Sequence, residues 1–347
     1  MTTLTDTVDI VIGVDPHKHF HAVAIVAAGT GKKLAALNVN ADPAGFNLLV
    51  KTADEYSKSR CWVIEGCGSW GRNLANWLIE AGEFVREIES PKRPARRMGK
   101  KTDDIDATRA AREALGREDL AEPRSAGDRD ALAALLMARR SAVQMATDTE
   151  RQLHALASIC PEALAKRLRG LKTHRMVTTC ARWRPRGDIA VVIVAQTMRN
   201  LAQRVRLLRE ESSEYENQID ILVRSWRPDL LELVGVGPII AATALTVWSH
   251  PGRIRNEAAF AMLSGVAPIP ASSGLTTRHR LNRRGDRQLN SAFHIVTIQR
   301  QRHDARTQAY FEKRRAEGKT DREIRRCLKR YIAREFYKIL ENPLDKQ

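Results

Sequence analysis

The segment Val-Asp-Ile-Val-Ile-Gly-Val-Asp, residues 8–15, decides the fold of the N-terminal part of the chain. Its branched apolar side chains predict a buried strand that ends in Asp15. Residues 16–18, Pro-His-Lys, follow as a turn, and the alternation of residue types from Phe20 to Ala24 predicts a returning strand. We therefore expect a β-hairpin that carries a carboxylate beside its turn.

The elements expected after this hairpin alternate between strands and helices. They are a strand at 34–39, a helix at 44–56, a strand at 61–66, a helix at 69–80, a strand at 84–88 and a helix at 102–115. Thr102 is the expected N-cap of the last helix, with acidic residues in its first turn. This order is that of the ribonuclease H architecture, a mixed sheet flanked by helices. We expect this α/β domain over residues 1–118.

Four carboxylates fall at strand ends or at a helix start, on what should be one edge of this sheet: Asp15, Glu65, Asp103 and Asp106. Asp103 and Asp106 are three residues apart on a helix and project from one face, whereas Asp104 points elsewhere. Hard oxygen ligands gathered in this way bind Mg²⁺, and two such ions assist phosphoryl transfer. The alternative, that these are unrelated surface acids, is disfavoured by the order of the three motifs.

A long helical region is expected between residues 128 and 226. Residues 117–130 are polar and contain Pro and Gly, which marks a domain boundary. A first helix is expected at 130–158, and an irregular hairpin tip between Gly170 and Gly187. The second helix carries a stripe with alternating spacings of four and three: Val194, Met198, Leu201, Val205, Leu208, Ser212, Tyr215, Ile219 and Leu222. This stripe predicts a coiled-coil arm or a long helical hairpin that serves packing or dimerisation.

The last third, residues 228–347, begins with a pattern typical of a helix-hairpin-helix. Leu230–Val234 is followed by Gly235-Val236-Gly237-Pro238 and by an apolar helix at Ile239–Trp248. The two glycines permit a tight turn, and Pro238 suits the first position of a helix. Free amides at the start of that helix can hold a DNA phosphate. The alternative is a turn within a packed, mainly α-helical bundle.

Composition favours a nucleic-acid partner. The formal net charge is +17 and the sequence pI is about 10.1, and such a surplus of Lys and Arg neutralises phosphates. The mean hydropathy of -0.39 and the lack of a long apolar run or a secretory signal lead us to expect a cytoplasmic protein without a membrane partner. The five cysteines form no Cys-x-x-Cys pair, so we expect reduced, packed thiols rather than a zinc site.

Six motifs in both halves of the chain resemble those of one transposase family. They are residues 11–18 (Val-Ile-Gly-Val-Asp-Pro-His-Lys), 65–71 (Glu-Gly-Cys-Gly-Ser-Trp-Gly), 100–107 (Lys-Lys-Thr-Asp-Asp-Ile-Asp-Ala), 234–238 (Val-Gly-Val-Gly-Pro), Phe260 with 265–268 and 272–274 (Gly-Val-Ala-Pro and Ser-Ser-Gly), and 283–286 (Arg-Arg-Gly-Asp). In this order they look like the motifs of the DEDD transposases, the insertion-sequence family numbered 110.

The resemblance implies a resolvase-like catalytic domain, a coiled-coil arm and a transposase domain with a nucleophilic serine. We assign that serine to Ser273, with Ser272 as the alternate. It implies a covalent phosphoserine intermediate with DNA, Mg²⁺ held by the four carboxylates, a structured guide RNA encoded by the element, and a homo-oligomer, either dimer or tetramer. A metal or a base has to activate the serine. The alternatives are a related DNA invertase and a non-catalytic, nucleic-acid-binding remnant of a transposase.

Basic residues near the serine suit a phosphodiester substrate, because guanidinium groups pair with phosphate oxygens. The residues expected to bind nucleic acid are Lys18, Lys100, Lys101, Gly235, Gly237, Arg278, Arg280, Arg283, Arg284 and Arg287. A solvated basic face is the alternative. The alternation of His17, His19 and His21 places three imidazoles on one strand face, and we interpret them as packed or solvent-facing rather than as metal ligands.

Overall fold

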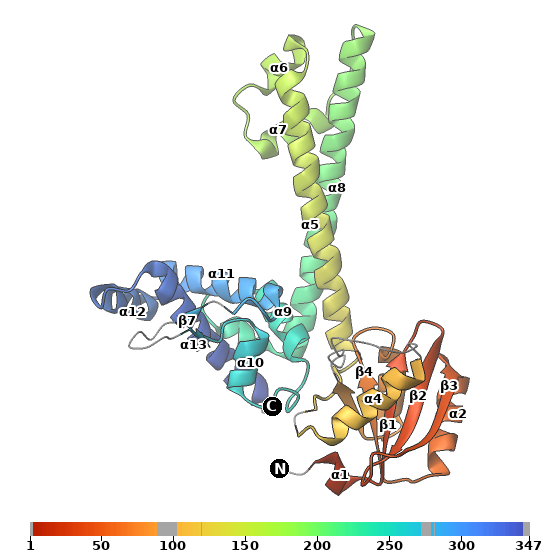
Figure 1. Cartoon of the computed structure of the whole chain (residues 1–347). Helices are drawn as coiled ribbons and strands as arrows, with labels where there is room; N and C mark the ends of the chain where they lie inside the picture. The colour runs from red at the N-terminus through yellow and green to blue at the C-terminus, as the bar shows by residue number, and fades with distance from the viewer. Residues whose placement is uncertain (1–2, 89–102, 119, 272–278, 281, 343–347) are drawn as a thin grey trace. The chain divides into compact units, whose positions relative to one another are not determined.

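A computed structural model describes residues 3–88, 103–118, 120–271, 279–280 and 282–342, without the side chains of Asp103 and Asp104 (Figure 1). The chain divides into two compact units. The N-terminal unit contains Met1–Ala126 and Ser249–Arg255, and the C-terminal unit contains Gly127–Trp248 and Asn256–Gln347. The three-part division expected from the sequence stays a prediction. No helix within the described ranges is long and apolar enough to cross a membrane.

The N-terminal unit is built on a five-stranded mixed sheet. Its strands are β1 (Ile10–Pro16), β2 (Phe20–Ala27), β3 (Lys33–Asn40), β4 (Arg60–Glu65) and β5 (Val85–Ile88), in the spatial order β3-β2-β1-β4-β5. The neighbours β1, β2 and β3 pair antiparallel, whereas β4 pairs parallel with both β1 and β5. The five expected strands and their order along the chain are therefore confirmed.

Helices cover the sheet of the N-terminal unit. Besides the short α1 (Leu4–Thr7), which was not expected, they are α2 (Pro43–Asp54), α3 (Arg72–Glu80) and α4 (Asp103–Leu115). Alternate residues of β1 share a core with α2 and α3, and Ile12 there lies with Leu49 and Leu74. The other residues of β1 belong to a core with α4, where Val11 lies with Ala111. Burial on both faces explains why the central strands are apolar throughout.

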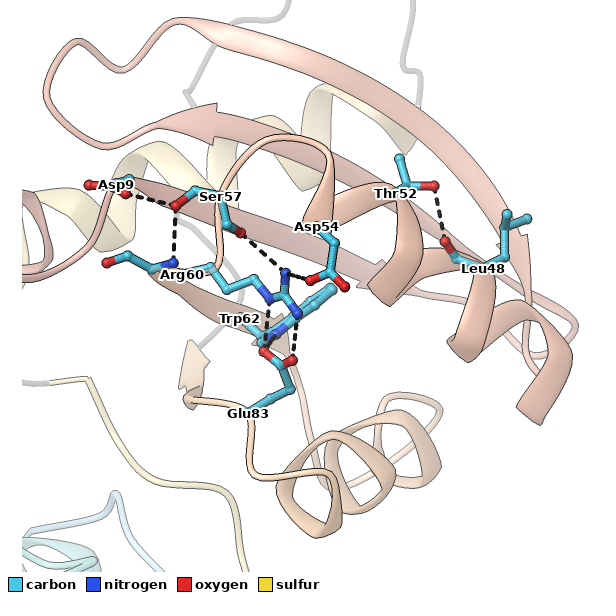
Figure 2. Close-up of polar contacts among 9 residues, drawn as sticks. Asp9, Leu48, Thr52, Asp54, Ser57, Arg60, Trp62 and Glu83 are labelled. Atoms are coloured by element: carbon cyan, nitrogen blue, oxygen red, sulfur yellow. Dashed lines mark hydrogen bonds and ion pairs between the residues drawn. The ribbon is translucent and has the colours of Figure 1, made fainter.

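A buried arginine anchors the start of β4 (Figure 2). The side chain of Arg60 is 5% exposed and donates to Asp54 at 2.5 Å and to both carboxylate oxygens of Glu83, at 2.6 and 2.9 Å. Trp62 donates to the same Glu83 carboxylate at 2.7 Å. These bonds hold the pKa of Glu83 below its usual value, first because Arg60 donates to it. The network ties β4 to the end of α2 and to the segment between α3 and β5, so the strand that ends in Glu65 has a defined position.

Helix α4 lies directly against β1, because Gly13 leaves no side chain between them. A Cβ atom on Gly13 would be 2.1 Å from the carbonyl oxygen of Ala107 and 2.8 Å from the amide nitrogen of Ala111. Only glycine permits two backbones to approach so closely. The buried alanines of α4 complete this contact: Ala107, Ala110, Ala111 and Ala114.

The C-terminal unit contains two long helices that lie side by side, α5 (Asp128–Ile159) and α8 (Ile189–Trp226) (Figure 1). Every second position of the expected stripe is buried, namely Met198, Val205, Ser212 and Ile219. The intervening positions Val194, Leu201, Tyr215 and Leu222 are half-buried, and Leu208 is buried against Ala142 and Ala146 of α5. The long helical pair is therefore confirmed, while coiled-coil geometry stays a prediction.

The tip between these helices is more regular than the sequence analysis expected. It contains α6 (Glu162–Leu168) and α7 (Thr173–Ala181), and α7 falls inside the segment expected to be irregular. Helix α7 forms because the tip has its own core, in which Met176, Cys180 and Trp183 pack with Met198 and Ala202 of α8. Local sequence did not reveal these contacts, because their partners lie on another helix.

The rest of the C-terminal unit is mainly helical. It comprises the 3₁₀ helix η1 (Pro228–Glu232), α9 (Pro238–Trp248), α10 (Glu257–Leu263), the hairpin β6 (Ile269–Pro270) with β7 (His279–Arg280), α11 (Arg287–His303), α12 (Ala305–Ala316) and α13 (Asp321–Glu341). In its core, the ring of Phe293 makes edge-to-face contacts with Phe260 and Phe336. The first helix expected for a helix-hairpin-helix is a single 3₁₀ segment, whereas the second begins at Pro238 as expected.

We predict that Gly13→Ala destabilises the N-terminal unit by about 1–3 kcal/mol or more, since α4 must move away from β1. Thermal unfolding followed by circular dichroism measures this loss. The control is Gly29→Ala, whose added Cβ atom would meet nothing within 4 Å. Equal stability of the two variants would show that α4 does not need the close contact.

We predict that Leu208→Glu lowers the free energy of unfolding of the α5–α8 pair by about 3 kcal/mol, because a carboxylate replaces a buried apolar side chain. The neighbouring Leu207 is 66% exposed, so Leu207→Glu is the matched control and should change stability little. Chemical denaturation and mass in solution are the measurements. Unchanged stability and unchanged mass for Leu208→Glu would contradict the packing of this helix face.

Candidate active site

Two predicted site carboxylates end neighbouring parallel strands. The register of β1 and β4 pairs Val14 with Ile64, so Asp15 and Glu65 follow at the same edge of the sheet. Val11 and Val63, on alternate positions of these strands, share a core with α4. Because side chains alternate along a strand, Asp15 and Glu65 belong to this α4-facing side.

The start of α4 reaches the same edge. At the opposite end of the helix, the carbonyl of Leu115 accepts a hydrogen bond from Thr5, which precedes β1, and Arg112 donates to the carbonyl of Gly31 in the β2–β3 turn. Helix α4 therefore runs antiparallel to β1. Its first turn, which contains Asp103 and Asp106, lies toward the carboxyl end of β1.

Two of the described acids of this edge have a cationic or imidazole neighbour. The Asp15 carboxylate is 18% exposed and its Oδ2 lies 3.5 Å from Nε2 of His17. Asp106 is 15% exposed and accepts a hydrogen bond from Arg109 at 2.8 Å. Glu65 is half-buried. The side chain of Asp103 lies outside the described residues, so three of the four predicted ligands can be placed.

Oxygen donors of this kind fit a divalent cation such as Mg²⁺, which prefers carboxylates and water. Among the side chains that the structure describes, however, no group of three or more His, Cys, Asp and Glu residues could hold a metal ion. The full set of four acids is thus untested as a metal site and stays a prediction.

The three histidines near the hairpin do not share a strand face. Only His21 lies in a strand, whereas His17 and His19 belong to the turn, with His19 exposed. His21 is fully buried and stacks on Phe46 with ring centroids 5.8 Å apart. Burial lowers the pKa of His21, which favours a neutral, packed imidazole. Lys18 is exposed in the same turn.

The predicted nucleophile falls between the two short strands of the C-terminal hairpin. Ser272, Ser273 and Arg278 lie outside the described residues, as do Lys100 and Lys101. At the base of the hairpin, Ile269 pairs with Arg280, and Pro270 with His279. In the sequence, position 273 falls between these paired residues.

Three motif residues close the backbone next to this hairpin. This frame consists of Gly265, Gly285 and Asp286. Gly265 and Gly285 both have positive φ, of 67° and 98°. A Cβ atom on Gly285 would lie 2.6 Å from the amide nitrogen of Gly265 and 2.6 Å from the carbonyl oxygen of Leu263. Asp286 caps α11 by accepting from Gln288 at 2.8 Å. The Arg-Arg-Gly-Asp motif therefore includes two residues with a structural role.

The described arginines of the predicted cluster face solvent. Arg280, Arg283, Arg284 and Arg287 are all exposed, and none of them has a carboxylate partner among the described residues. Such guanidinium groups can pair with phosphate oxygens. Gly235, by contrast, has a packing role: its φ is 81°, and an added Cβ would lie 3.0 Å from Cβ of Gln299 in α11. The space beside Gly237 is open.

A second set of cations, which the sequence patterns did not reveal, lies close to Gly265. Lys319 and, on α13, Arg326, Lys329 and Arg330 line a groove together with residues of the β6–β7 hairpin. Their recurrence at helical spacing in residues 326–330 is a signal that could have found them. Their proximity to residues 265–282 depends on tertiary packing and could not be read from spacing.

Family models match segments in both halves of the chain. The model for DEDD transposases of the IS110 group, described as "Transposase", matches residues 12–161, and the model described as "Transposase IS116/IS110/IS902 family" matches residues 228–312. No curated protein matches the chain. The first range includes Asp15, Glu65, Asp103 and Asp106, and the second includes Ser273. The two matches together span more than half of the sequence, and the chain belongs to the IS110 family of DEDD transposases.

Proposed function

We propose that this transposase cuts and rejoins double-stranded DNA by metal-dependent phosphoryl transfer with Ser273 as the nucleophile. The observation that supports this most is the arrangement of the N-terminal unit. Asp15 and Glu65 end adjacent parallel strands, and the first turn of α4 comes to the same sheet edge. The sheet order β3-β2-β1-β4-β5 and the helix on this face support a ribonuclease H-like domain.

The four acids have a common task in this proposal. Asp15, Glu65, Asp103 and Asp106 would hold Mg²⁺, and the ion would supply positive charge against the phosphate oxygens during transfer. Arg109 orients the Asp106 carboxylate through the 2.8 Å hydrogen bond. His17 lies beside Asp15 and restricts the orientation of that carboxylate. The close packing at Gly13 holds these groups on one rigid frame.

Ser273 performs the nucleophilic step. Its Oγ loses a proton to a neighbouring base and forms a bond to a DNA phosphorus. The phosphorus–oxygen bond to one deoxyribose breaks, and the released oxygen takes up a proton. The phosphoserine ester conserves the energy of the broken bond, so a second deoxyribose hydroxyl can displace the serine and rejoin the strands. Ser272 is the alternate nucleophile.

Two partners complete the proposal. A structured RNA encoded by the element selects the DNA, which is consistent with the resemblance to the IS110 family and with a formal net charge of +17. The protein acts as a homo-oligomer, either dimer or tetramer, joined through the α5–α8 pair. Exposed apolar side chains on this pair, such as Met137 and Ile221, supply apolar surface for such contacts.

We predict that Asp103→Asn reduces strand transfer by roughly 100-fold or more, since one charged oxygen ligand is lost. DNA binding, measured by fluorescence anisotropy, should stay nearly unchanged. The neighbouring substitution Asp104→Asn is the matched control, because Asp104 is expected to project away from the site. If both variants lose DNA binding and strand transfer together, Asp103 serves the structure of α4 instead.

We also predict that Ser273 forms a covalent adduct with DNA that survives denaturant. Ser273→Ala should abolish the adduct while retaining DNA binding, and Ser272→Ala should retain the adduct. Denaturing electrophoresis with labelled DNA, followed by peptide mass spectrometry, identifies the modified residue. Full recombination activity in Ser273→Ala would contradict the serine mechanism and leave the carboxylates as the whole active site.

A further inference from the structure

A basic groove of about 580 Å³ lies within the C-terminal unit, beside the β6–β7 hairpin. One wall contains residues 265–268 together with His279 and Arg280 of β7. The other wall is the N-terminal half of α13 and the residue that precedes it by two positions, Lys319. All of the groove's described lining thus comes from one compact unit.

Positive charge in the groove exceeds the negative charge that lines it. Five cations line it: Arg280, Lys319, Arg326, Lys329 and Arg330. The lining includes one carboxylate, Glu323, and that group is engaged in capping α13, because it accepts hydrogen bonds from the amide and hydroxyl of Thr320 at 2.9 and 2.8 Å. Arg330 pairs with Glu257 at 3.2 Å, but Glu257 also pairs with Arg334 at 2.8 Å. The groove therefore has a strong local surplus of positive charge.

One of these cations is buried in the wall of the groove. Lys329 is 9% exposed and donates to Oδ1 of Asn290 at 2.9 Å. Asn290 in turn donates to the carbonyls of Ser264 and Gly265, at 3.1 and 2.9 Å. This chain of bonds links α13 to the frame below the hairpin. Burial and the nearby charge of Arg326 lower the pKa of Lys329, a cost that a bound anion would offset.

We propose that this groove binds the phosphodiester backbone of DNA beside strand β7, with Arg326 and Arg330 as phosphate contacts and Lys329 as a buried anchor. Arg326 and Arg330 are one helical turn apart, which presents two guanidinium groups on the same side of α13. Tyr331, which is 53% exposed, lies at the groove and offers an aromatic face to a base or sugar.

The assignment to DNA rests on the proposed function, since His279 and Arg280 in the lining of the groove follow closely in sequence after Ser273, the residue expected to attack DNA. A nucleophile needs its substrate held close by, and fixed cations provide this positioning without contacting the reacting atoms. RNA is the competing occupant of such a site, so the experiment includes both nucleic acids.

Cys327 provides a built-in probe, because it is a half-buried free thiol in the lining of the groove. Cys160, also half-buried, lies at the end of α5 and serves as an internal control, whereas Cys61, Cys67 and Cys180 are buried.

The full-length Ser273→Ala variant is alkylated with a maleimide, with and without a short DNA duplex, and each thiol is quantified by peptide mass spectrometry. With DNA at about ten times its Kd, alkylation of Cys327 should slow roughly tenfold. The rate at Cys160 should stay constant.

Variants on α13 sharpen the test. Arg326→Gln should weaken the protection of Cys327 and reduce the slope of log affinity against log salt by about 1, as expected for one lost phosphate contact. Arg322→Gln removes the same charge from an exposed residue of α13 that does not line the groove, and it should retain the protection. Equal effects of both variants would indicate general charge screening and overturn the site.

The outcomes separate this proposal from the serine mechanism. Saturating DNA without protection of Cys327 would overturn the groove, even if a Ser273 adduct forms in the wild type. Protection without any adduct would support the groove and overturn Ser273 as nucleophile. Protection by an RNA duplex but not by DNA would assign the groove to RNA and overturn the DNA assignment.

Discussion

The contact between Gly13 and α4 is the constraint on which the candidate active site depends. An added Cβ would be 2.1 Å from the carbonyl oxygen of Ala107, so helix and strand meet backbone to backbone. This contact, with the antiparallel direction of α4, brings the acidic first turn of the helix to the carboxyl end of β1. The parallel register of β1 and β4 adds Glu65 at that edge. A larger residue at position 13 would displace the helix start while leaving the strand ends in register, and so would separate the two pairs of acids.

A similar principle organises the region around the predicted nucleophile. Gly265 and Gly285 meet through their backbones, and Asp286 starts α11 as its cap. These residues of the family motif are needed for geometry, whereas the exposed Arg283 and Arg284 between them are available to a polyanion. Motif residues in this chain therefore divide into those that close the backbone and those that carry charge. The Arg-Arg-Gly-Asp motif contains both backbone-closing and charged residues. A match to the motif therefore does not tell which residues bind a polyanion and which ones shape the backbone.

The sequence predicted well those features that local periodicity determines. The five strands, the position of α4 and the buried stripe on α8 all follow from residues that are close in sequence. Helix α7 was missed because its core partners, such as Met198, are on another helix. The 3₁₀ segment η1 replaced an expected α-helix where Arg227 is buried and donates to the carbonyls of Ile339 and Leu340, at the far end of the chain. The α13 cations were missed for the same reason, since their relation to residues 265–282 is purely tertiary. The strand and helix positions of the four predicted acids could be foreseen from the sequence. The contacts of Asp106 with Arg109 and of Asp15 with His17 could not.

The two units cannot be separated by a single cut in the chain. Ser249–Arg255 follows α9 in sequence yet belongs to the N-terminal unit. There the hydroxyl of Ser249 accepts a hydrogen bond from the amide of Ser125 at 2.8 Å, and His250 lies 3.1 Å from the carbonyl of Pro123. Ser249 is fully buried with a φ of 81°, a conformation that a non-glycine residue adopts only when its surroundings impose it. Residues 1–118 alone would therefore lack part of the packing of their own unit. The carboxylates and the serine belong to different units, and the chain passes between those units at more than one point, so the proposed chemistry has to be tested with both units present.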